Sequence, residues 1–102
     1  MFYIKPYIEK LEEFCRRWRI TEVALFGSAL RDDFGPDSDI DLLARFEPEV
    51  HWTILDHVQM EDELAEIFGR KVDLWNRMAV EESENPYRKK EILNTARVIF
   101  TA

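Results

Sequence analysis

The chain has 102 residues, of which 46% are hydrophobic, and a formal net charge of −7, so it can fill the core of a single domain spanning residues 1–102. The acidic balance argues against direct binding of nucleic acid or of an anionic membrane, because both need a basic protein surface. The single cysteine, Cys15, excludes an intramolecular disulfide, and no stretch resembles a secretory signal or a membrane span, so we expect a cytoplasmic protein.

The N-terminal segment predicts an amphipathic helix. Its apolar residues recur at the spacing of one helical face from Ile4 to Trp18. Pro6 stands near the start of this helix, where the missing N–H group of proline does no harm.

A strand and a tight turn are expected next. The segment 21–26 (TEVALF) is rich in strand-forming residues and ends at Gly27 and Ser28, a pair typical of a turn that leads into a helix. Residues 29–34 can form only a short helix, because the cluster Gly-Pro-Asp-Ser at 35–38 must end it.

Residues 39–46 predict a second strand with two unlike faces. Successive side chains of a strand point to opposite faces, so the carboxylates of Asp39 and Asp41 share one face. The other face is apolar and comprises Ile40, Leu42, Ala44 and Phe46.

A long helix is expected from Thr53 to about Phe68. Thr53 and Asp56 resemble a capping box at its start, and Gly69 provides a C-terminal stop. The apolar stripe with which this helix would cover the sheet comprises Ile54, Leu55, Val58, Leu64, Ala65 and Phe68.

The segment 71–76 (KVDLWN) predicts a third strand. Val72 and Leu74 would face one way, and Asp73 and Trp75 the other. Trp75 could stack on a nucleotide base from this position, although packing in the core is the simpler interpretation.

The C-terminal segment predicts a helix over residues 87–94, after the break at Asn85-Pro86. Residues 96–100 (ARVIF) predict either a short strand or the end of that helix. The order of elements is typical of an α/β (α+β) domain with helices packed on one sheet of three to four strands. Only about a dozen residues join the first two strands, barely enough for a parallel crossover, so we expect a mixed sheet.

Three aspartates predict a magnesium site. Asp39 and Asp41 share one face of a strand, and Asp73 on a neighbouring strand can converge with them into a cage of oxygen ligands. Three crowded carboxylates repel one another unless cations neutralise them, and two Mg²⁺ ions roughly 4 Å apart would suit in-line phosphoryl transfer. Gly27 and Ser28 would hold the triphosphate, because glycine allows close approach of the backbone and the serine hydroxyl can donate to phosphate oxygens.

The string GSALRDDFGPDSDID, from Gly27 to Asp41, resembles the signature of the DNA polymerase β-like nucleotidyltransferase superfamily, and specifically of its minimal, single-domain members. GRKVDLW after the long helix and NPYRKKEIL near the C-terminus resemble the same members, so the resemblance spans most of the chain. It implies the polymerase β-like nucleotidyltransferase fold.

The resemblance also implies a role for each site residue. Asp39 and Asp41 would bridge two Mg²⁺ ions, and Asp73 would bind the catalytic ion. Gly27 and Ser28 would hold the β- and γ-phosphates of the nucleotide, with ATP as the expected substrate.

Arg31 stands where many minimal members of this family have an arginine, and it could stabilise phosphate charge. The family often has glycine after that arginine, whereas this chain has Asp32.

Minimal members of the family are typically encoded beside a helical HEPN-type protein. Several such pairs resemble toxin and antitoxin, in which the nucleotidyltransferase inactivates its partner by moving AMP from ATP onto a tyrosine. The resemblance therefore implies a Mg²⁺-dependent nucleotidyltransferase that acts as the antitoxin of a HEPN toxin.

Two other functions fit the same residues. The chain could be a non-catalytic antitoxin that neutralises its partner by covering it, or a transferase for a small molecule such as an aminoglycoside, which would need a separate substrate-binding subunit. His51 and His57 have no partners at metal-ligand spacing, and the short basic clusters at 16–19 and 88–90 predict solvated helix faces that could contact an acidic partner.

Overall fold

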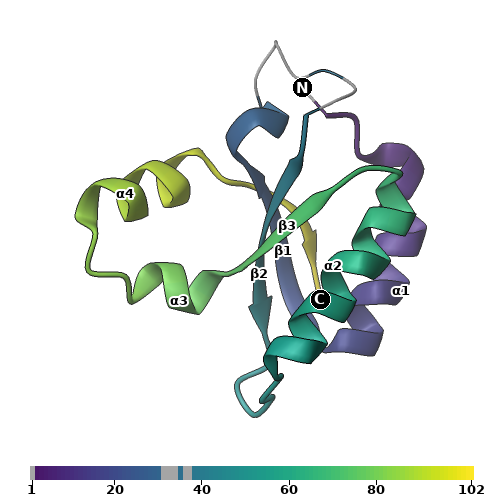
Figure 1. Ribbon diagram of the computed structural model, residues 1–102, viewed down its shortest axis with the longest axis horizontal. Coiled ribbons are helices and arrows are strands. Elements are labelled where there is room, and N and C mark those ends of the chain that lie inside the picture. Colours follow the sequence, from purple (N-terminus) through teal and green to yellow (C-terminus); the bar gives the residue numbers. More distant parts are fainter. Residues whose placement is uncertain (1, 31–34, 36–37) are drawn as a thin grey trace.

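The computed structural model describes residues 2–30, 35 and 38–102. Its centre is a four-stranded sheet with the strand order β3-β2-β1-β4 (Figure 1). The strands are β1 (Ile20–Phe26), β2 (Ile40–Phe46), β3 (Val72–Asn76) and β4 (Arg97–Thr101). The helical elements are the 3-10 turns η1 (Lys5–Tyr7) and η2 (Gly27–Leu30) and the helices α1 (Ile8–Trp18), α2 (Ile54–Phe68), α3 (Arg77–Glu81) and α4 (Pro86–Thr95).

The sheet is mixed, as expected. Strand β1 pairs antiparallel with both β2 and β4, whereas β3 runs parallel to β2. Residues 97–101 form a strand, which decides between the two interpretations of the C-terminal segment. Strand β4 takes the edge next to β1, so β3 lies at the opposite edge.

Helices cover both faces of the sheet. Helices α1 and α2 pack on one face, and the shorter α3 and α4 lie on the other side (Figure 1). The larger core cluster joins α1 and α2 to the apolar face of β2, through residues that include Leu11, Phe14, Leu42, Met60 and Leu64. The smaller cluster comprises Ala24, Phe26, Leu43, Val80 and Ile92. Within the described residues, no helix is long and apolar enough to cross a membrane.

Helix α1 starts later than the spacing of apolar residues predicts. Residues Lys5–Tyr7 form a 3-10 turn that contains Pro6, and the α-helix begins only at Ile8. It ends at Trp18 and is capped by Arg19, which adopts a left-handed conformation with φ of 58°.

The ends of α2 follow the predicted signals. The side chain of Thr53 accepts a hydrogen bond from the N–H of Asp56, whose carboxylate accepts in turn from the N–H of Thr53. Gly69 caps the C-terminus with φ of 70°. The capping box and the glycine stop are therefore confirmed.

The first half of the apolar stripe predicted for α2 is wrong, because its residues do not face the sheet. Ile54, Leu55 and Val58 are exposed, and the residues that α2 buries are Met60, Leu64 and Phe68. The buried residues repeat every four positions and face the sheet, and the 100° turn per residue carries Leu55 and Val58 to the opposite side of the helix. Packing against the sheet therefore does not explain why Ile54, Leu55 and Val58 are apolar.

Candidate active site

The register of the sheet brings two of the predicted aspartates to one level. Asp41 in β2 is paired with Asp73 in the parallel strand β3, and on its other side it is paired with Phe26 in β1. Asp39 immediately precedes β2, and side-chain alternation places it on the same side as Asp41. The structure thus brings Asp39, Asp41 and Asp73 into one neighbourhood, beside the turn that follows β1.

The electrostatics of Asp41 reflect this crowding. Partial burial raises the pKa of the Asp41 carboxyl above its ordinary value of 3.8, and the negative charges of Asp73 and Asp39 raise it further. A raised pKa means that the folded protein disfavours the ionised form of this group. A bound cation would reverse that preference, because it attracts the carboxylates that repel one another.

The three carboxylates are neighbours, but they do not form a closed cage. Among the described residues, no three Asp, Glu, His or Cys side chains are gathered closely enough to hold a metal ion. The Asp39 carboxylate lies 3.8 Å from the Nζ atom of Lys71, in an ion pair whose two members are largely exposed to solvent. Exposed pairs of this kind contribute little free energy, so Asp39 can leave Lys71 at small cost. The donor set consists of carboxylate oxygens, which are the ligands that suit Mg²⁺.

Gly27 begins the turn η2 at the end of β1 and lies against Asp41. Its φ is 70°, a conformation that favours glycine, and a Cβ atom at this position would lie only 2.7 Å from Oδ2 of Asp41. The side chain of Ser28 in the same turn, and all of Arg31, lie outside the described residues, so their predicted contacts with phosphate stay predictions.

Arg70 ties the segment before β2 to the start of β3. Its Nη1 donates to the carbonyl oxygens of Gly35 at 2.9 Å and of Ser38 at 3.2 Å. The N–H of Ile40 donates to the carbonyl of Lys71 at 3.0 Å, which joins the start of β2 to the residue before β3. These bonds hold the backbones that carry Asp39 and Asp73 side by side. The sequence places an arginine here, but it does not indicate these partners.

Glu61 of α2 anchors the edge strand that carries Asp73. Its Oε2 atom accepts a hydrogen bond of 2.8 Å from the backbone N–H of Leu74. His57, one turn earlier, places Nε2 at 3.7 Å from the same oxygen. The sequence does not indicate this role, since an acidic residue on a helix is ordinarily solvated.

Trp75 packs against its neighbours on the face it shares with Asp73. Its ring meets that of Phe26 edge to face at a centroid distance of 5.9 Å, and the guanidinium of Arg88 lies 4.5 Å from the centroid of the Trp75 ring. Trp75 therefore packs against its neighbours, as the simpler interpretation predicted. Arg88, which belongs to the basic cluster at 88–90, makes a cation–π contact with the Trp75 ring.

Comparisons with known proteins identify the family and the fold. Residues 8–99 match the family described as the nucleotidyltransferase domain. The chain belongs to this family. A relative from Methanocaldococcus jannaschii that is named a protein adenylyltransferase is 30% identical over 90 residues, which cover 87% of each chain.

Solved structures have the same fold as this nucleotidyltransferase. One structure of a minimal nucleotidyltransferase has a TM-score of 0.69 at 29% identity and covers 92% of this chain and 90% of that chain. The MNT antitoxin complex with the tri-AMPylated HEPN toxin of Shewanella oneidensis has a TM-score of 0.66, with 98% of this chain and 74% of that chain covered. Because identity in that second case is 14%, the likeness shows the fold alone. The predicted family and fold are confirmed.

Proposed function

We propose that this nucleotidyltransferase moves AMP from ATP onto a hydroxyl group of a helical HEPN-type protein, as the antitoxin of a toxin–antitoxin pair. The observation that carries the proposal is the register of the sheet. It pairs Asp41 with Asp73 in β3 on one side and with Phe26, the last residue of β1, on the other. This register puts two carboxylates beside a glycine turn, an arrangement suited to Mg²⁺ and to the phosphates of a nucleoside triphosphate. The relatives named as protein adenylyltransferases and as MNT antitoxins support a protein acceptor.

Each part of the site has a defined task in this reaction. Gly27 keeps the wall beside Asp41 free of a side chain, so that the phosphates of ATP can approach the backbone of the turn. Asp39, Asp41 and Asp73 would hold Mg²⁺, which supplies charge neutralisation at the phosphates when it is bound. Partial burial, and after it the negative charges of Asp73 and Asp39, raise the pKa of Asp41 in the free protein, and those negative charges favour cation binding at this place.

The transfer exchanges a phosphoanhydride bond of ATP for a phosphate ester bond on the acceptor. The oxygen of the acceptor hydroxyl forms a bond to the α-phosphorus of ATP, and the bond between that phosphorus and the bridging oxygen of the β-phosphate breaks. The hydroxyl proton passes to solvent, and pyrophosphate leaves. The protein contributes mainly by positioning and by electrostatic stabilisation, because phosphoryl transfer needs little covalent chemistry from side chains.

Label transfer tests this proposal. The chain is incubated with Mg²⁺, the purified HEPN-type protein and ATP labelled at the α-phosphate, and a parallel reaction contains ATP labelled at the γ-phosphate. The proposal expects label on the acceptor from the first nucleotide only. Neutralisation of the partner without any label would instead identify a non-catalytic antitoxin.

A further inference from the structure

Four exposed hydrophobic side chains belong to the segment 52–58, where α2 begins, and a fifth, Met78, lines the neighbouring hollow together with Trp52. They are between 38% and 83% exposed, and we call them the apolar rim: Trp52, Ile54, Leu55, Val58 and Met78. The other large hydrophobic residues exposed in the described part of the chain, Tyr3, Tyr87 and Val98, belong to other segments. Single exposed apolar residues are ordinary, whereas a group of this kind marks an interaction surface.

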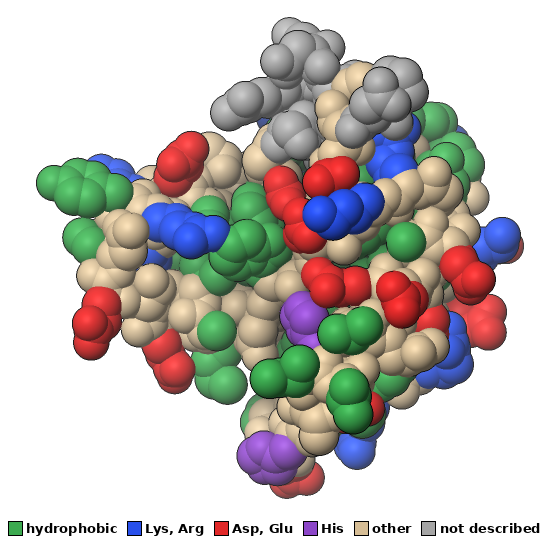
Figure 2. Space-filling model, in the orientation of Figure 1, with side chains coloured by type: hydrophobic (Ala, Val, Ile, Leu, Met, Phe, Trp, Pro, Cys, Tyr) green, Lys and Arg blue, Asp and Glu red, His purple; other side chains and the backbone are tan. Residues whose placement is uncertain are grey.

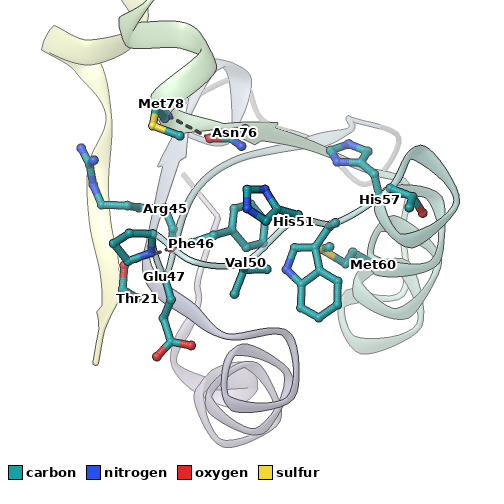
Figure 3. A pocket seen from close by; sticks show the side chains of 13 residues that line it. Thr21, Arg45, Phe46, Glu47, Val50, His51, His57, Met60, Asn76 and Met78 are labelled. Atoms are coloured by element: carbon teal, nitrogen blue, oxygen red, sulfur yellow. Dashed lines mark hydrogen bonds between the residues drawn. The ribbon is translucent and has the colours of Figure 1, made fainter.

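The apolar rim adjoins a hollow of about 590 Å³. Figure 3 shows this hollow between the loop after β2, helix α2 and the start of α3. Phe46, Val50, His51, His57 and Met60 are among the residues that line it, together with Trp52 and Met78 of the apolar rim. The surface is therefore indented as well as apolar, so a partner side chain can enter it.

The exposed side of α2 has a regular pattern that extends from the apolar rim. Ile54, Val58, Asp62 and Glu66 are all exposed and follow one another at intervals of four residues. Residues spaced by four form a ridge along a helix, and such ridges pack into the grooves of a second helix. The ridge is apolar in its first half and acidic in its second half.

Helix α2, which carries most of the apolar rim, is bonded to the edge strand β3 that carries Asp73. Val58 precedes Glu61 by three residues, which is about 4.5 Å along the helix axis. Glu61 is bonded to the N–H of Leu74, the residue after Asp73. Figure 2 shows hydrophobic side chains between the two histidines on the same face as a group of acidic side chains. A protein seated on the apolar rim can therefore reach the site.

We infer that the apolar rim is the docking surface for the acceptor protein, and that its occupant is an amphipathic helix of that protein. The apolar residues of the docking helix would cover Val58 and the hollow, and its basic residues would meet Asp62 and Glu66. A second copy of this chain is a poor occupant, because each copy carries a net charge of −7 and the same acidic ridge. This inference rests on the proposed function and adds where the partner binds.

Acceptor kinetics and direct binding test the docking surface. The variants Leu55→Lys and Val58→Lys place a like charge opposite the basic helix, and Val98→Lys is the matched control, since Val98 is 52% exposed on β4 at the other edge of the sheet. We expect the Kd for the purified HEPN-type protein, and the KM for it in label transfer, to rise about tenfold or more in both rim variants. The value of kcat and the stabilisation by Mg²⁺ with ATP should stay as in the wild type.

The outcomes separate the two proposals. Wild-type binding without label transfer would contradict the proposed function, and the Kd values of the rim variants would still decide where the partner docks. Unchanged Kd and KM in both rim variants would overturn the docking surface. So would loss of self-association alone in those variants, measured by analytical ultracentrifugation, because a second copy would then be the occupant.

Discussion

Gly27 and Asp41 are in such close contact that position 27 has no room for a Cβ atom, which would lie 2.7 Å from Oδ2 of Asp41. Gly27 directly follows β1, which pairs antiparallel with β2, and Asp41 is opposite Phe26, the last residue of β1. The turn and the carboxylate therefore form one structural unit. A change on either side of this contact should affect both phosphate binding and the position of the carboxylate.

The variant Gly27→Ala should lose activity as well as stability. We expect the free energy of unfolding to fall by about 1 to 2 kcal/mol, because alanine is strained at positive φ. We expect kcat/KM for label transfer to fall at least about tenfold, because Asp41 must move away from the added methyl group. Chemical denaturation and label transfer measure the two effects.

Gly69→Ala is the matched control for this prediction. Gly69 has the same φ of 70°, but a Cβ atom there would have nothing within 4 Å. It should lose stability to a similar extent and keep its activity. Equal activity of the two alanine variants would show that the contact with Asp41 has no functional importance.

The variant Asp41→Asn should stabilise the metal-free protein at neutral pH. The folded state raises the pKa of Asp41 above 3.8, so the fold favours the protonated carboxyl. The contribution of Asp41 to stability is therefore fully present below that pH and is lost as the pH rises through the raised pKa. Asparagine stays neutral and avoids this loss. The melting temperature of the variant should therefore exceed that of the wild type at pH 7 and approach it near pH 3.

Added Mg²⁺ should invert the comparison at pH 7, since the wild type gains a ligand that the variant binds weakly. Glu91→Gln, which removes an exposed carboxylate from α4, is a suitable control. An Asp41→Asn variant that melts below the wild type in metal-free buffer would contradict a cost of ionising Asp41 through burial and the charges of Asp73 and Asp39.

Much of the site could be predicted from sequence because its signals are local. The alternation of β2 and β3 gives the faces of Asp41 and Asp73, and the breaker residues limit where each strand can begin. The pairing of β3 with β2 depends on contacts distant in sequence, and so do the bonds of Arg70 and Glu61. No periodicity within one segment indicates such partners.

The prediction that Ile54, Leu55 and Val58 are buried is wrong for a related reason. Hydrophobicity identifies residues that avoid water, but it does not distinguish a protein core from a surface that another protein covers. Met60, absent from the predicted stripe, is the residue that α2 buries in their place. An apolar residue of α2 can thus be assigned to the core or to an interaction surface only once the position of the sheet is known.

The variant Glu61→Ala should loosen the edge strand. Removal of the carboxylate leaves the N–H of Leu74 without this acceptor, and we expect a loss of about 1 to 2 kcal/mol in the free energy of unfolding. Glu61→Gln retains an acceptor oxygen and should keep most of the stability. Amide hydrogen exchange at Leu74 reports the effect directly. Equal exchange rates in wild type and Glu61→Ala would contradict the anchoring role.

Cys15 should be unreactive in the folded protein. Burial, and secondarily the charge of Glu12, raise the pKa of the Cys15 thiol to about 12. At pH 8 we expect alkylation by iodoacetamide to be at least about 100-fold slower than in urea, because the thiolate is the reactive form. Rapid alkylation without denaturant would show that α1 is not packed as described.

The most direct test of the central claim compares label transfer by the wild type, Asp41→Asn and the control Glu91→Gln, each with Mg²⁺, ATP labelled at the α-phosphate and the HEPN-type acceptor. We expect a labelled acceptor with the wild type and with Glu91→Gln, and a loss of at least about 100-fold in kcat/KM with Asp41→Asn. Transfer by Asp41→Asn at the rate of the wild type would contradict the assignment of this aspartate to the catalytic site.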